Sequence, residues 1–223
     1  MTSLILALIG VAMLALCGLA LRLWTRVGSI ALLLAAILVG LAYDNLAMAI
    51  GRFVGYGDVL LALNVPRFWI HAIATPLVII VAGNLVERLG VGQIHGRNIT
   101  LGGWALVAML ILIGIVEAAR AQLVPENAGD ALRYTDAATS GPPLPAIITV
   151  LAVIVVGVMA FRYAGFPWLF FGGLVMLVAA AVGGVVFWIG NLGELVLMTS
   201  VMATLAAVAG YRVPSFASLG GIR

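Results

Sequence analysis

The sequence predicts an all-α fold, a polytopic membrane protein whose residues 1–223 form a single bundle of about seven transmembrane helices. Of the 223 residues, 65% are hydrophobic and only 9% are charged, and the mean hydropathy is +1.26. Soluble domains of this length carry far more polar residues. Several apolar runs reach roughly 20 residues, the length that crosses a bilayer as a helix. The runs are continuous and do not alternate, which excludes a transmembrane barrel.

Seven apolar segments are the predicted spans. The first has no positively charged leader, so we expect it to be retained and not to be a signal peptide. Short joins that contain glycine, proline or arginine separate most of the segments, as is typical of turns. The predicted spans are residues 3–21, 28–51, 66–86, 101–121, 144–163, 166–189 and 191–211.

Two connections are too long to be simple turns. Residues 52–65 begin with glycines and reach Asp58, which suits the N-cap of a short helix. We therefore expect a re-entrant or interfacial segment there. Residues 122–143 are the one long polar stretch of the chain and predict a mobile outer loop or lid.

The arginines indicate the orientation of the bundle. Seven arginines fall at one end of the predicted spans and four at the other. Because short cytoplasmic loops carry an excess of basic residues, the first end is expected to face the cytoplasm. The chain is therefore predicted to be a multi-pass protein of the cell membrane, with its N-terminus outside and its C-terminus inside.

Several chemistries are excluded by residues that the sequence lacks. All eleven basic residues are arginine, so no lysine is present to form a retinal Schiff base. Cys17 is the only cysteine, which rules out an intrachain disulfide and cysteine-based zinc sites. We found no nucleotide, haem or nucleophile-elbow motif, and no basic cluster interleaved with aromatic residues. We therefore expect no cofactor, no metal and no nucleic-acid partner.

Four titratable residues from four predicted spans share one depth. With about 1.5 Å of rise per residue, Asp44 and Glu117 lie roughly 24 Å along spans that run outward. His71 and Glu194 lie roughly 7 Å and 5 Å into spans that run inward. Ionisable groups at membrane depth usually face a bundle interior or a wet cavity. The predicted catalytic acid–base residues are therefore Asp44, His71, Glu117 and Glu194.

Polar residues near this layer are candidates for binding a substrate. Asn64, Arg67 and His71 fall on one stripe of a helix. Arg67 is expected to hold an acid such as Asp44 or Asp58 in its charged form, or to bind an anionic head group. The predicted substrate-binding residues are Arg67, Asn45, Asn64, Tyr43 and Asp58.

Most of these residues also have a purely structural interpretation. Arginines near the outer end, such as Arg120, can extend toward the lipid head groups. His71 suits a hydrogen bond between packed helices as well as it suits catalysis. Glu194 and Asp58 suit the first turn of a helix. Asp44 lies within a predicted span and has no capping role, so structure alone explains it least.

The leading hypothesis is an integral membrane enzyme that acts on an amphiphilic lipid or isoprenoid by acid–base chemistry. Its pocket would open to the outer half of the bilayer. In size and in having acids on the second and seventh spans, the chain is similar to the small seven-helix integral-membrane terpene cyclases. The similarity is one of topology, and no motif matches residue by residue. It implies protonation of an alkene or epoxide; an isomerase or hydrolase would use the same groups.

Two other functions remain open. A non-catalytic receptor, assembly factor or subunit of a membrane complex would use the outer acids and residues 122–143 as a docking surface. A small proton-coupled transporter fits the chain less well, because the sequence has no internal repeat and no polar residues that continue through the midplane. Association with further copies of the chain or with a partner subunit is also open.

Overall fold

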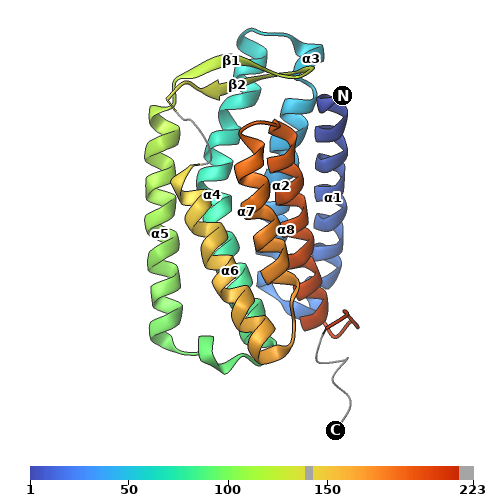
Figure 1. Cartoon of the computed structure of the whole chain (residues 1–223), viewed down its shortest axis with the longest axis vertical. Coiled ribbons are helices and arrows are strands. Elements are labelled where there is room, and N and C mark those ends of the chain that lie inside the picture. The colour runs from blue at the N-terminus through green and yellow to red at the C-terminus, as the bar shows by residue number, and fades with distance from the viewer. Residues whose placement is uncertain (139–142, 216–223) are drawn as a thin grey trace.

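The structure, a computed structural model, describes residues 1–138 and 143–215. The fold is mainly helical, as predicted, and it also contains a β-hairpin that was not predicted (Figure 1). In chain order the elements are α1 (Thr2–Val27), α2 (Ser29–Ala49), α3 (Gly51–Val54), α4 (Asp58–Arg88), the 3₁₀-helix η1 (Gly92–Ile94), α5 (Arg97–Arg120), β1 (Leu123–Ala128), β2 (Ala131–Asp136), α6 (Leu144–Ala164), α7 (Trp168–Gly183) and α8 (Phe187–Val208).

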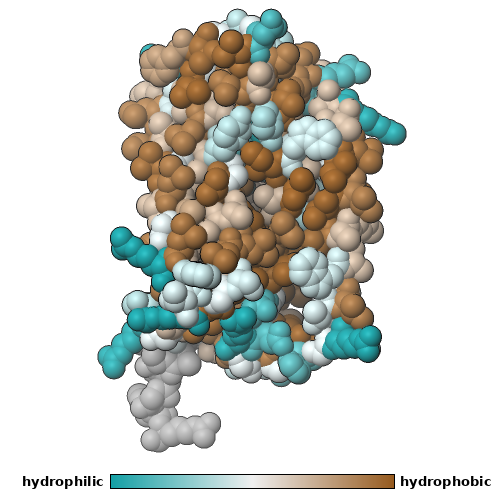
Figure 2. Space-filling view, turned by 180° about the vertical axis from the view of Figure 1, so that it is seen from behind, coloured by the Kyte–Doolittle hydropathy of each residue, from teal (hydrophilic) through white to brown (hydrophobic). Residues whose placement is uncertain are grey.

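Six of the described helices are long and apolar enough to cross a membrane, namely α1, α2, α4, α5, α6 and α8. Many large hydrophobic side chains are exposed on their surfaces. Figure 2 shows such residues over most of one face of the molecule, with hydrophilic residues mainly toward its ends. Helix α7 has 16 residues and is about 24 Å long, which is less than the roughly 30 Å of a hydrocarbon core. These features support a membrane protein.

Most neighbouring helices run antiparallel, whereas α4 and α6, which both begin at the hairpin end, run parallel (Figure 1). Helix α1 packs on α2, α6 on α7 and α7 on α8, while α4 contacts α2, α5 and α6. Buried side chains of α1, α2, α4 and α8 supply most of the largest apolar core. Small residues allow close approach at several contacts. A Cβ on Gly157 of α6 would lie 2.5 Å from the backbone nitrogen of Phe170 on α7, so only glycine fits there.

Helix α4 is a single helix of 31 residues that begins at Asp58. The predicted boundary at Pro66 is therefore wrong, because Pro66 and Pro76 both lie inside this helix. Membrane helices tolerate proline where neighbouring groups satisfy the freed backbone. Residues 58–65 of the predicted re-entrant or interfacial segment 52–65 form the first two turns of α4. Asp58 is exposed and its side chain makes no capping hydrogen bond, because the N-cap is Gly57.

The predicted outer loop contains an ordered β-hairpin. Strand β1 pairs with β2 in antiparallel register over the full length of both strands. Residues 123–136 of the predicted mobile outer loop or lid contain these two strands and their turn, and residues 139–142 lie outside those described. Gly129 in the turn has a φ of 64°, in the left-handed region that glycine adopts readily. The hairpin lies across the end of the bundle that carries the N-terminus (Figure 1).

Polar contacts and a close backbone approach fix the hairpin to the bundle. The carboxylate of Asp130, in the hairpin turn, accepts hydrogen bonds from Arg52 Nη1 at 2.7 Å and from the Ser3 amide at 3.1 Å. A Cβ on Gly51 would lie only 1.9 Å from the carbonyl oxygen of Leu132. Strand β2 therefore rests directly on the backbone of α3.

Candidate functional site

A cavity of about 860 Å³ lies inside the bundle, next to the hairpin. Side chains of α2, α4, α5, α6, α7 and α8 line it, and residues of both strands complete the wall. The end of α7 and its connection to α8, residues 183–187, also belong to the wall. Figure 1 shows this connection below the hairpin, since the short α7 ends before it reaches the strands. The cavity thus occupies the end of the bundle where the N-terminus lies.

The centre of the polar wall is formed by Asp44 on α2 with two residues of α4. Arg67 Nε donates a hydrogen bond to Asp44 Oδ1 at 2.8 Å, and the two residues are 7% and 1% exposed. His71 Nε2 lies 3.4 Å from the same carboxylate oxygen, and His71 Nδ1 lies 3.3 Å from the Thr75 hydroxyl. Because Arg67 and His71 are one helical turn apart, both reach Asp44. The carboxylate is thus held by a charge-assisted hydrogen bond and has an imidazole beside it.

All three nitrogen atoms of Arg67 have protein partners. Besides the contact with Asp44, Nη1 donates to Asn64 Oδ1 at 2.6 Å and to the Tyr134 carbonyl at 3.5 Å, and Nη2 donates to the sulfur of Met48. Asn64 Oδ1 also accepts the Tyr134 amide at 3.1 Å. Arg67 therefore positions Asp44 and ties the hairpin to α4. These contacts favour the first of our two expectations for Arg67, holding an acid, over binding an anionic head group.

Two further acids line the same cavity. Glu194 on α8 is half-buried and interacts electrostatically with His71 and Asp44. Glu117 on α5 is exposed, and within the described residues no hydrogen bond or ion pair joins it to the other three. Of the predicted cluster, Asp44 and His71 are thus in contact, Glu194 lies within electrostatic range of both, and Glu117 is a separate acid on the α5 wall.

The other four predicted substrate-binding residues are not among the described residues that line the cavity. The Tyr43 hydroxyl donates to a backbone carbonyl of α4 at 2.9 Å. Asn45 is fully buried, and its side-chain oxygen accepts a hydrogen bond from α8 at 3.1 Å. Asn64 supports Arg67, and Asp58 lies exposed at the start of α4. Tyr43 and Asn45 therefore link neighbouring helices, and Asn64 supports Arg67 without lining the cavity.

The wall also contains residues that the sequence analysis did not single out. The guanidinium carbon of Arg133 on β2 lies 3.7 Å from the centre of the Phe187 ring, and Arg133 Nη2 lies 2.5 Å from a carboxylate oxygen of Glu126. Burial lowers the pKa of Arg133, although Glu126 opposes this effect. Thr149 on α6 is 1% exposed, and its hydroxyl has no hydrogen-bond partner among the described residues. A lone threonine in an apolar helix gives no sequence signal; strand alternation could have indicated Arg133.

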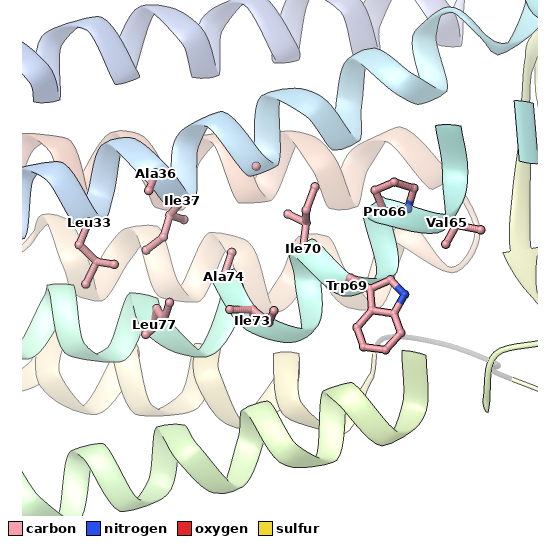
Figure 3. A pocket seen from close by; sticks show the side chains of 11 residues that line it. Leu33, Ala36, Ile37, Val65, Pro66, Trp69, Ile70, Ile73, Ala74 and Leu77 are labelled. Carbon is pink, nitrogen blue, oxygen red and sulfur yellow. The ribbon is translucent and has the colours of Figure 1, made fainter. Parts of the chain in front are cut away.

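A second hollow, of about 540 Å³, lies between α2 and α4 (Figure 3). Apolar side chains line it, among them Trp69 and Ile73 of α4 and Leu33 of α2. None of the described residues that line it is titratable. Ile37 contributes to both hollows. Of these two hollows, only the larger one has titratable side chains among its described lining residues.

The fold and the cavity together indicate a class, a helical membrane protein with a cavity near one end of its bundle whose largely apolar wall carries several charged residues. Comparison of the chain with known protein families, with curated proteins and with solved structures gave no match. In the part of the chain that the structure describes, no three His, Cys, Asp or Glu side chains are grouped so that they could hold a metal ion.

Proposed function

We propose that the protein is an integral membrane enzyme that acts on an amphiphilic lipid or isoprenoid by acid–base chemistry. The observation that carries this proposal is the meeting of Asp44, His71 and Glu194 in the wall of one cavity. Ionisable groups at membrane depth are costly, and a cluster of them in a cavity favours a functional role. The cavity volume of about 860 Å³ lies within the range of ligand sites, roughly 300 to 1,000 Å³.

The three groups have different surroundings, which favours different roles. Asp44 is buried and held by Arg67, so it orients the imidazole of His71 and balances its charge. His71 and Glu194 are each partly open to the cavity, so they are the groups that exchange a proton with a bound ligand. Such a pair serves protonation of an alkene or epoxide, isomerisation of a double bond, or hydrolysis of an ester.

The ligand would enter from the bilayer between α5 and α6. Both helices contribute to the cavity wall, with Glu117 and Ala118 on α5 and Ala146 and Thr149 on α6. Helix α5 packs mainly against α4 and stands at the edge of the bundle (Figure 1). An amphiphile that entered here would keep its polar group near the hairpin and its apolar tail along the helices.

We further propose that α7 also crosses the membrane, which makes seven spans, and that the hairpin end faces outward. The end of the bundle opposite the hairpin carries Arg26 and Arg88, which suits a cytoplasmic location. Cysteine accessibility tests this in a Cys17→Ser background. Ala138→Cys should react with an impermeant maleimide on intact cells, and Arg97→Cys only after permeabilisation. The reverse pattern would invert the proposed topology.

Incubation with lipids in heavy water tests the proposed chemistry. The purified protein in nanodiscs, supplied with a total membrane lipid extract and an isoprenoid panel, should yield a product of new mass. The product would carry carbon-bound deuterium if a double bond is protonated. Asp44→Asn, His71→Gln and Glu194→Gln should each abolish product formation without unfolding the protein.

The matched control is Glu87→Gln, because Glu87 pairs with His95 on the far side of the bundle from the cavity. This variant should form the product at the wild-type rate. The proposal fails if the wild type produces nothing beyond the protein-free reaction, or if Asp44→Asn forms the product as fast as the wild type.

A further inference from the structure

Acidic side chains outnumber basic ones around the larger cavity. Its described lining has five carboxylates but only three basic side chains, Arg67, Arg133 and His71. Arg67 pairs with Asp44, and Arg133 pairs with Glu126. Even if His71 carries a proton, the lining keeps an excess of negative charge. An anionic head group would therefore be repelled from this cavity.

Two of the remaining carboxylates have no arginine as a partner. Glu194 makes no ion pair with any described arginine, and the nearby His71 acts on it electrostatically. Glu117 makes no ion pair with any described residue. The third, Asp136, accepts backbone N–H groups of Gln122 and Ala138. A carboxylate in a membrane cavity without a counter-charge is costly, and a bound cation would supply that charge.

An unpartnered hydroxyl points independently to a ligand in this cavity. Thr149 is 1% exposed and lines the cavity, yet its Oγ1 has no hydrogen-bond partner among the described residues. A threonine in a helix can bond a carbonyl of the preceding turn, and buried polar atoms are normally satisfied. The unpartnered hydroxyl therefore indicates a partner beyond the described residues, and a ligand in the cavity would supply one. Arg133 Nε is likewise buried and unpartnered.

We propose that the cavity binds an amphiphile whose head group carries a protonated or quaternary amine, seated between Glu194 and Glu117. Thr149 provides a polar contact to the same head group, and the ring of Trp188 in the wall is a further partner for an ammonium group. The free N–H of Arg133 can donate to an acceptor oxygen beside the amine, as in a zwitterionic lipid. This inference rests on the proposed function and names the class of its substrate.

Binding of three probes to the purified full chain in a neutral detergent tests the proposal by calorimetry. The probes are dodecyltrimethylammonium, dodecylphosphocholine and laurate, which share one tail and differ in head-group charge. Both ammonium probes should bind, and laurate should bind at least about tenfold more weakly. Glu194→Gln should weaken ammonium binding at least about tenfold, because loss of one partner of a desolvated charge pair is at least that costly. Tighter binding of dodecylphosphocholine than of dodecyltrimethylammonium would assign the zwitterionic head group.

Two further variants and one control separate binding from folding. Thr149→Val removes the hydroxyl at nearly constant volume and should weaken dodecylphosphocholine binding while the protein melts as the wild type does. Glu117→Gln, at an exposed position, is the second charge variant if Glu194→Gln melts early. Glu87→Gln, which removes a charge far from the cavity, should bind all three probes as the wild type does.

The inference is overturned if laurate binds as tightly as the ammonium probes, or if neither charge variant changes ammonium binding. Failure here is distinguishable from failure of the proposed enzyme. Conversion of an uncharged isoprenoid by the wild type would contradict the proposed amine head group and support the proposed enzymatic function. Binding of the ammonium probes without formation of any lipid product would support the proposed head group and contradict the proposed enzymatic function.

Discussion

Replacing Arg67 by methionine removes the charge-assisted hydrogen bond to Asp44 and leaves only the His71 imidazole, 3.4 Å away, beside this buried carboxylate. Arg67 is 7% exposed and Asp44 is 1% exposed, so water cannot replace the lost 2.8 Å hydrogen bond. Removing one partner of a buried ion pair costs about 3–5 kcal/mol. Arg67 also donates to Asn64 and to the Tyr134 carbonyl of the hairpin, which favours the upper part of this range.

Each kcal/mol lowers the melting temperature of a chain of 223 residues by roughly 2–4 °C. The Arg67→Met variant should therefore melt roughly 6–20 °C below the wild type, measured by circular dichroism in a neutral detergent. The double variant Asp44→Leu/Arg67→Met removes both charges and should recover most of the loss, because apolar replacement of a buried pair is often neutral.

Two results would refute this reasoning. One is a melting temperature of Arg67→Met within about 2 °C of the wild type, which corresponds to less than about 1 kcal/mol. The other is a double variant whose loss equals the sum of the two single losses, since residues that act as a pair are not additive.

Two predictions concern the hairpin. A Cβ on Gly51 would lie 1.9 Å from the Leu132 carbonyl oxygen, so Gly51→Ala should loosen the hairpin and expose it to limited proteolysis. The control Gly102→Ala, at an open position of α5, should leave proteolysis of the hairpin unchanged. Equal cleavage of the two variants would count against the docked hairpin. Hydrogen bonds from the N-terminal amine and the Ser3 amide lower the pKa of Asp130 to about 2. The stabilisation of the hairpin by the Asp130 carboxylate is therefore fully present above the ordinary carboxyl pKa of about 4. It is lost as the pH falls from about 4 to about 2. Pepsin cleavage of the hairpin, normalised to an unstructured peptide, should rise over that interval in the wild type but stay level in Asp130→Asn.

The long apolar helices could be predicted because continuous apolar runs form helices wherever water is excluded. The start of α4 could not be predicted in this way, because Pro66 resembles the first residue of a helix, although it lies within one. The hairpin was also missed. Its order comes from contacts such as those with Gly51 and Asn64, which are distant in the chain and leave no local pattern.

The same contrast holds for the candidate site. Helical spacing puts Arg67 and His71 on one face of a helix, and matching depth puts Asp44 at their level. Neither feature says which helices face one another. Depth alone therefore could not show that Glu117 lies apart from Asp44 and His71. It also could not indicate that Asn45 links two helices behind the cavity wall.

An experimental density map of the protein in native lipid tests most directly whether ionisable groups of separate helices surround a cavity that receives an amphiphile. We predict elongated density in the cavity, with its polar end within hydrogen-bond distance of Glu194 or His71 and its tail between α5 and α6. A cavity filled by repacked side chains, or Asp44 and Glu194 turned away from each other toward lipid, would contradict this.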